Sequence, residues 1–206
     1  MNEFKKRLKL TEEIKPKNNK KNYYIMYNEK KQKIGKIYAD YEELQNNWLK
    51  GVSIFVITED GKLVIEKRAQ DTKLTPGQID LCSGHRDNDE KGKSSAYREL
   101  KEELGIKKRQ VLKLKKIRSE VPLIFKGDRK FFIQFYAGII KQRKSNLELQ
   151  EEEVSKIEEV PLEEGFELIR EGKTKFPYFG REKEFEEIFE KITEFCKEHK
   201  NTEICL

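Results

Sequence analysis

The chain is poor in the residues that build histidine-rich metal sites and disulfide frameworks. His85 and His199 are its only histidines, so a metal site held by three histidines cannot be assembled within it. The three cysteines, Cys82, Cys196 and Cys205, contain no CxxC pair, and their number is odd. Because no signal peptide accompanies them, this cysteine usage predicts a reducing environment, and we expect the protein to be cytoplasmic.

Long apolar runs are missing as well. No stretch approaches the length of a transmembrane helix, so the sequence predicts no membrane span. Lys and Arg together number 44 against 38 Asp and Glu, which gives a net charge of +6 and a pI near 9.0. This balance is compatible with a polyanionic partner such as RNA, but acidic runs interrupt the basic clusters and no RNA-binding signature is present. A solvated, charged surface that attracts substrate phosphate is therefore favoured over a nucleic-acid partner.

The most informative segment is residues 84–106, GHRDNDEKGKSSAYRELKEELGI. Its stretch Ala96–Leu104 contains no Gly or Pro and is rich in helix formers, which predicts a helix. Glu99, Glu102 and Glu103 follow at spacings i, i+3 and i+4, so they share one helix face. Three crowded carboxylates repel one another unless a cation lies between them, and hard oxygen ligands suit Mg²⁺ or Mn²⁺. Such a cation in turn suits a diphosphate substrate, because it neutralises charge on phosphate oxygens.

Residues around the three carboxylates support this interpretation. Arg98 can reach Glu102 at i+4 and hold it in place. Gly84 allows a close backbone approach at the start of the loop that leads to the helix. The alternative is a solvated surface helix, which is common for an isolated run of Glu, Lys and Arg. The fixed spacing of Gly84, Glu90 and Gly105 disfavours that alternative.

The segment matches the Nudix box, which is Gly, five residues, Glu, seven residues, then Arg-Glu-apolar-x-Glu-Glu-x-Gly-apolar. The matching positions are Gly84, Glu90, Arg98, Glu99, Leu100, Glu102, Glu103, Gly105 and Ile106. On these residues the chain resembles the Nudix hydrolase family. The resemblance implies a Mg²⁺-dependent pyrophosphohydrolase that cleaves a small molecule, a nucleoside diphosphate linked to another moiety, by attack of metal-activated water on phosphorus. Homodimers are frequent in that family, so a homodimer is one of the oligomeric states that the resemblance allows.

The resemblance also implies roles for individual residues. Glu102 and Glu103 would be the main metal ligands, and Glu99 would be a ligand or the base that activates water. The backbone carbonyl of Ser83 would be a further ligand. Glu90 would make an ionic contact that holds the loop against the helix.

Residues 23–106 are also similar to the isopentenyl-diphosphate isomerase-like branch of the family. The similar stretches are Tyr27-Asn28-Glu29, Ile34-Gly35-Lys36, Val52–Ile57, Glu66-Lys67-Arg68, Lys73–Asp80 and Ser83-Gly84-His85. The isomerase groups themselves are missing. Ser83 stands in place of the isomerase cysteine, and Cys82, one residue earlier, would face the other way on a strand. Residues 38–49 contain no His, and 128–136 contain no Glu-x-Glu. Retention of every box carboxylate therefore favours hydrolysis. Isomerase-like activity and a non-catalytic nucleotide-sensing module stay as alternatives.

Two further features are candidates for the site. Arg68, at the end of a predicted strand, could contact substrate phosphate or lie on the surface. A loop after the box often supplies one more carboxylate in such enzymes, and Glu151, Glu152 and Glu153 are candidates for it. A solvated acidic loop is the alternative for those three residues.

Apolar patterning alone predicts a mixed α and β domain, and the resemblance implies the Nudix α/β/α sandwich, a mixed β-sheet between helices. We expect a charged N-terminal extension over 1–20 and a single hydrolase domain over 21–200. Strands are predicted at 23–28, 34–38, 51–58, 63–68, 78–82, 111–117, 131–140 and 154–160. A loop holding Pro122 would join the strands at 111–117 and 131–140. Helices are predicted at 162–170 and 182–198, the latter strongly amphipathic.

Overall fold

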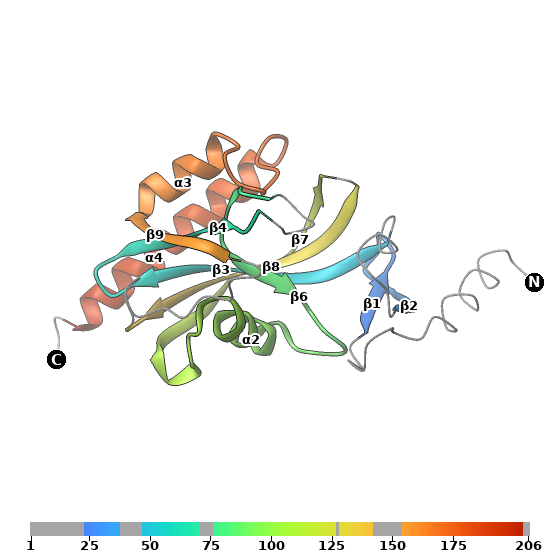
Figure 1. Ribbon diagram of the computed structural model, residues 1–206, viewed down its shortest axis with the longest axis horizontal. Helices are drawn as coiled ribbons and strands as arrows, with labels where there is room; N and C mark the ends of the chain where they lie inside the picture. The colour runs from blue at the N-terminus through green and yellow to red at the C-terminus, as the bar shows by residue number, and fades with distance from the viewer. Residues whose placement is uncertain (1–22, 38–46, 71–75, 127, 142–153, 204–206) are drawn as a thin grey trace, which may run out of the picture.

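The computed structural model describes residues 23–37, 47–70, 76–126, 128–141 and 154–203. A large mixed sheet carries helix α2 (Gly92–Leu104) on one face and helices α3 (Leu162–Arg170) and α4 (Glu182–Glu203) on the other (Figure 1). The predicted α/β class, with a mixed sheet between helices, is therefore confirmed. No helix in the described ranges combines the length and the apolar character that a membrane crossing requires.

The sheet is organised around the long strand β3 (Trp48–Thr58). Strand β8 (Arg129–Ile140) runs parallel to β3 along its whole length. On the other edge of β3, residues 56–57 pair with β4 (Lys62–Arg68) and residues 51–54 pair with β6 (Cys82–His85), both antiparallel. Because β4 and β6 share one edge of β3, they diverge from each other.

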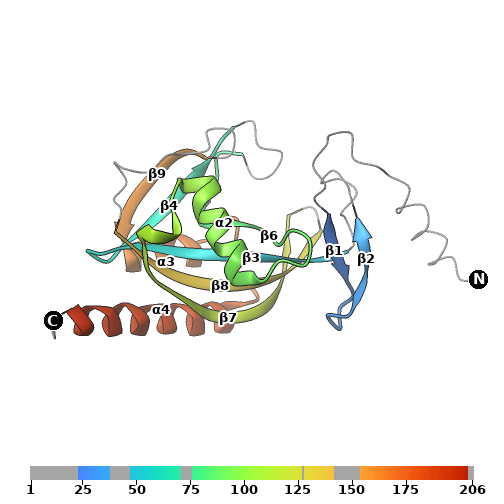
Figure 2. The same ribbon diagram turned by 90° about the horizontal axis from the view of Figure 1, so that it is seen from below.

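The remaining strands extend this frame through antiparallel pairs. Strand β7 (Val111–Phe125) follows a short 3-10 turn, η2 (Lys108–Gln110), and pairs with β8. Strands β5 (Ile79–Asp80) and β9 (Val154–Pro161) both pair with β4. The hairpin of β1 (Tyr24–Tyr27) and β2 (Lys33–Ile37) projects from the Trp48 end of β3 (Figure 2).

The alternation of side chains along β3 creates two cores, one on each face of the sheet. Val52, Ile54 and Val56 pack on the α2 face with Leu100 and Leu104. The residues between them on β3 turn to the face covered by α3 and α4, where the core is rich in phenylalanine. Burial of Leu100 and Leu104 on the α2 face fixes which side of the box helix is free for chemistry.

Several element boundaries differ from those predicted. Pro122 does not lie in a loop: it is paired with Phe132 within the β7–β8 ladder, so β7 runs beyond residue 117. Proline is tolerated there because β7 pairs only with β8 among the described strands, and an edge strand leaves alternate N–H groups unused. The box helix starts at Gly92 rather than Ala96, and α4 continues past residue 198. The predicted strand at 78–82 is divided into β5 and β6. The charged extension over 1–20 lies outside the described residues.

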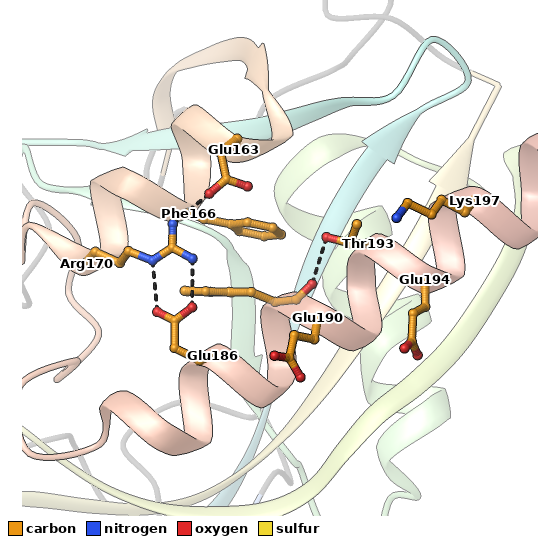
Figure 3. A pocket seen from close by; sticks show the side chains of 9 residues that line it. Glu163, Phe166, Arg170, Glu186, Glu190, Thr193, Glu194 and Lys197 are labelled. Atoms are coloured by element: carbon orange, nitrogen blue, oxygen red, sulfur yellow. Dashed lines mark hydrogen bonds and ion pairs between the residues drawn. The ribbon is translucent and has the colours of Figure 1, made fainter.

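Helices α3 and α4 enclose a groove of about 310 Å³ on the face of the sheet opposite to the box helix (Figure 3). The rings of Phe166 and Phe189 stack there with centroids 4.3 Å apart. The Arg170 guanidinium binds the Glu186 carboxylate through two parallel contacts, Nε to Oε1 at 2.8 Å and Nη2 to Oε2 at 2.7 Å. These two contacts join α3 to α4, and Arg170 Nη1 also reaches Glu163 on its own helix at 2.7 Å.

Replacing Arg170 by Met should lower the free energy of unfolding by about 1–2 kcal/mol near neutral pH, because a bidentate pair is lost. The hydrogen bonds from Arg170 lower the pKa of Glu186. A lowered folded-state pKa stabilises the fold above the unfolded carboxyl pKa, and this contribution is lost as the pH falls through the folded-state pKa. Urea unfolding at neutral and acidic pH should therefore show a difference between wild type and variant that shrinks in acid. Arg181→Met, which removes a single contact with Glu184, is the matched control. An undiminished difference in acid would contradict the ion-pair explanation.

Candidate active site

The box helix α2 is fixed at its C-terminal end by Gly105. This residue adopts a left-handed conformation with φ of 67°, which glycine accepts without steric cost. Its N–H donates to the Lys101 carbonyl at 3.1 Å, and the Ile106 N–H donates to the Leu100 carbonyl at 2.9 Å. The helix therefore ends at a defined place, with the fully buried Ile106 anchored in the core.

Arg98 organises the outer part of the box. Its Nη1 atom lies 2.8 Å from Glu99 Oε1 and 2.8 Å from Glu102 Oε2, and its Nε lies 3.2 Å from Glu90 Oε2. Its Nη2 donates to the His85 carbonyl at 2.6 Å. The predicted Arg98–Glu102 contact and the predicted ionic contact of Glu90 with the helix are both confirmed. Burial alone would lower the pKa of Arg98, but the surrounding carboxylates raise it above its ordinary value.

Glu99 and Glu103 turn inward from α2 toward β6, and both are buried. Glu103 Oε2 accepts a hydrogen bond from the Ser83 backbone N–H at 2.8 Å. The Glu99 carboxylate lies against Gly84 so closely that a Cβ atom at that position would overlap it. The glycine of the box therefore makes room for a carboxylate, in addition to allowing a close backbone approach.

A further buried carboxylate comes from β4. Glu66, Cys82 and Glu103 each bring one potential ligand atom into a group whose members lie within 4.8 Å of one another. Burial, followed by the neighbouring Glu66 and Glu99 carboxylates, raises the pKa of Glu103 well above its ordinary value. Burial also raises the pKa of the Cys82 thiol, and a protonated thiol is a poor metal ligand.

This arrangement fits a hard divalent cation. Three buried carboxylates, from Glu66, Glu99 and Glu103, converge where β4 and β6, which pair with the same edge of β3, diverge from each other. Their mutual repulsion is relieved when a cation binds between them, and their oxygen donors match the preference of Mg²⁺ or Mn²⁺. Nudix hydrolases generally use such divalent ions.

The other predicted site residues occupy different places. Glu102 is half exposed and is held by Arg98 at the rim of this buried group. Arg68 Nη1 lies 3.5 Å from the carboxylate of Asp80, a side chain with no exposed surface. Glu151, Glu152 and Glu153 lie outside the described residues.

The residues of β6 alternate between the two faces of the sheet. The Cys82 side chain lies with Glu66 and Glu103, whereas the Ser83 hydroxyl accepts a hydrogen bond from Lys175. The predicted opposite orientation of Cys82 and Ser83 is therefore confirmed. The ring of His85 packs 4.9 Å from Tyr24 and 5.1 Å from Phe131, between centroids. Burial lowers the pKa of His85 to about 3, so the imidazole is neutral at physiological pH.

Three residues were not predicted to belong to this site: Glu66, Asp80 and Lys175. Glu66 and Asp80 face each other in the β4–β5 ladder. Lys175 comes from the segment between α3 and α4, where its Nζ lies 2.5 Å from Asp80 Oδ2 and 2.6 Å from Ser83 Oγ. Glu66 interrupts a buried apolar run in β4, which is a weak sequence indication of function. Nothing local in the sequence distinguishes Lys175 from the many other lysines.

Comparison with known families identifies the class of the protein. A model of the NUDIX domain matches residues 48–179, which is more than half of the chain. The chain therefore belongs to the Nudix family, and at the family level it is a hydrolase that acts on pyrophosphate bonds.

Solved structures share the fold at low sequence identity. DR0079 from Deinococcus radiodurans is 19% identical, with a TM-score of 0.62 over 77% of this chain and 95% of that chain. The MutT protein from Methanosarcina mazei Go1 is 21% identical, with a TM-score of 0.51 over 71% of this chain and 94% of that one. An Ap4A hydrolase of C. elegans, crystallised as a binary complex, is 17% identical, with a TM-score of 0.52 over 71% and 96%. A search of curated protein sequences found no match.

Proposed function

We propose that this protein hydrolyses a nucleoside diphosphate linked to another moiety, in a Mg²⁺-dependent reaction in which water attacks phosphorus. The observation that carries the proposal is the convergence of Glu66, Glu99 and Glu103, all buried, beside the Ser83–Gly84 backbone. A bound Mg²⁺ would neutralise charge on the diphosphate and make its water ligand more acidic; Mn²⁺ could replace it.

Residues of the box and of β4 would each have a distinct role in this reaction. Glu103 would hold the metal with the Ser83 backbone carbonyl, and Glu66 is a further ligand candidate alongside Glu151–Glu153. Glu99 would be a ligand or the base that takes a proton from water. Glu102, at the rim of the buried carboxylates, would become a further metal ligand when metal and substrate bind. Arg98 would orient Glu99 and Glu102, since its guanidinium contacts both.

The test of this proposal is hydrolysis of a panel of diphosphate compounds with Mg²⁺, measured by chromatography of the phosphomonoester, nucleotide or phosphate products. The panel contains ADP-ribose, NADH, dinucleoside polyphosphates, nucleoside triphosphates and isopentenyl diphosphate. We expect turnover of at least one nucleoside compound. Chelation with EDTA should abolish it, and added Mg²⁺ or Mn²⁺ should restore it, because buried carboxylates without a cation repel the substrate's own negative charge.

Two outcomes would contradict hydrolysis. Conversion of isopentenyl diphosphate to its isomer without phosphate release would assign the isomerase-like alternative. Tight binding of a panel member without turnover, in the presence of either metal, would assign the nucleotide-sensing alternative. Turnover that survives EDTA would refute the metal dependence while leaving hydrolysis in place.

A further inference from the structure

A second ionic group lies beside the three carboxylates. Asp80, whose side chain has no exposed surface, contacts Lys175 Nζ at 2.5 Å and Arg68 Nη1 at 3.5 Å. Both cationic side chains are themselves largely buried, with 18% of Lys175 and 12% of Arg68 exposed. Two cationic side chains therefore flank one buried carboxylate, next to a site where several carboxylates are gathered.

Ser83 links the positive group to the carboxylates. Its backbone N–H donates to Glu103 Oε2 at 2.8 Å, and its hydroxyl accepts from Lys175 Nζ at 2.6 Å. Ser83 therefore contacts both Lys175 and Glu103, and although burial raises the pKa of Glu103, the charge of Lys175 lowers it. A phosphate bound next to Glu103 would be within reach of Lys175.

The hydrogen bonds of Lys175 favour an anion-binding role. A lysine ammonium has three N–H donors, and among the described residues Asp80 and Ser83 accept from it. The third donor is available for a phosphate oxygen. Lys175 and Ser83 also have the spacing of a Ser–Lys nucleophile pair, but a base must accept the hydroxyl proton. An ammonium paired with a buried carboxylate donates instead.

We propose that Lys175 binds the diphosphate of the substrate, on the phosphate next to the one that the metal site holds, and that Asp80 orients Lys175 for this contact. This inference rests on the proposed function and adds a residue from the segment between α3 and α4 to the substrate site. Arg68 reaches the same carboxylate at 3.5 Å.

The test uses three variants of the full chain and methylenediphosphonate as a diphosphate that cannot be hydrolysed. Lys175→Met removes the charge at similar volume, and Lys175→Arg retains it. Lys173→Met is the matched control, since Lys173 lies in the same segment, 57% exposed, in a surface ion pair with Glu171 at 2.6 Å. Calorimetry measures binding of the diphosphonate with Mg²⁺ and, separately, binding of Mn²⁺ alone.

We expect Lys175→Met to weaken diphosphonate binding by about 10- to 100-fold, the loss typical of a charge-assisted hydrogen bond. Lys175→Arg should retain much of the affinity, and Lys173→Met should match wild type. Binding of Mn²⁺ to Lys175→Met should be unchanged or tighter, because a neighbouring positive charge has been removed. In turnover, Lys175→Met should raise KM more than it lowers kcat.

Weaker binding of the diphosphonate without weaker binding of Mn²⁺ separates phosphate binding from a structural role. Parallel weakening of Mn²⁺ and diphosphonate binding in Lys175→Met would overturn the inference, because it would mean that the site itself is disturbed. Unchanged diphosphonate binding in that variant would overturn it too, without affecting the proposed function. If wild type bound no diphosphonate and hydrolysed no panel compound, the proposed function would fail, and this inference with it.

Discussion

Glu103→Gln is expected to lower kcat for hydrolysis of the substrate's diphosphate bond by about 10³-fold or more. On the proposed function Glu103 holds the metal, and removal of a metal ligand forfeits several kcal/mol of transition-state stabilisation, with about tenfold in rate for each 1.36 kcal/mol. Glu103 is 2% exposed and stands at the centre of the buried carboxylate group. Glutamine has nearly the same shape and its carbonyl can still accept from the Ser83 N–H, so the fold should be retained.

The measurement is kcat on the best substrate of the panel, together with the thermal unfolding midpoint and the affinity for Mn²⁺. Glu164→Gln, on the exposed side of α3, is the matched control and should behave as wild type. We expect Glu103→Gln to bind Mn²⁺ more weakly without unfolding at a lower temperature. A folded Glu103→Gln protein with wild-type kcat would refute the assignment of Glu103 as a metal ligand.

Gly84→Ala is expected to lower activity by about 10²-fold, because small displacements of a catalytic group have effects of that order. A methyl group at residue 84 would overlap both oxygens and the Cδ atom of the Glu99 carboxylate. The backbone has little freedom to move away, since Gly84 is paired with Val52 in the β3–β6 ladder. Glu99 must therefore shift from its place between Arg98 and Gly84.

A double variant tests this explanation directly. Glu99→Asp shortens the side chain. If the two residues compete for one space, the loss of activity in the double variant should be smaller than the two single losses combined. Gly138→Ala is the control in the same sheet: its added Cβ would meet the flexible end of Leu114 at 3.2 Å, and none of its three nearest atoms belongs to a carboxylate. Fully additive losses, or equal losses at Gly84 and Gly138, would contradict a specific clash with Glu99.

The local part of the site could be predicted because its residues are close in sequence. Helical spacing places Arg98 within reach of Glu102, and a short loop returns Glu90 to the same helix, as the structure confirms. The turn at Gly105 follows from the same local chemistry, since few other residues adopt a positive φ without strain.

The long-range part could not be predicted from a single sequence. The register of the β4–β5 ladder brings Glu66 and Asp80 together. Lys175 reaches Asp80 because α3 and α4, which flank its segment, dock on the face of the sheet opposite to α2. No local pattern specifies either register or docking. The position of Pro122 differs from the prediction for a related reason: proline commonly marks a loop, but an edge strand also tolerates it.

The most direct test of metal-dependent hydrolysis is turnover of the best panel compound in water enriched in ¹⁸O, followed by mass spectrometry of the products. We expect one ¹⁸O atom in a phosphate group of one product, formed only with Mg²⁺ or Mn²⁺ and lost in Glu103→Gln. Label in a non-phosphate group, or a rearranged diphosphate that carries no label, would contradict attack of water on phosphorus.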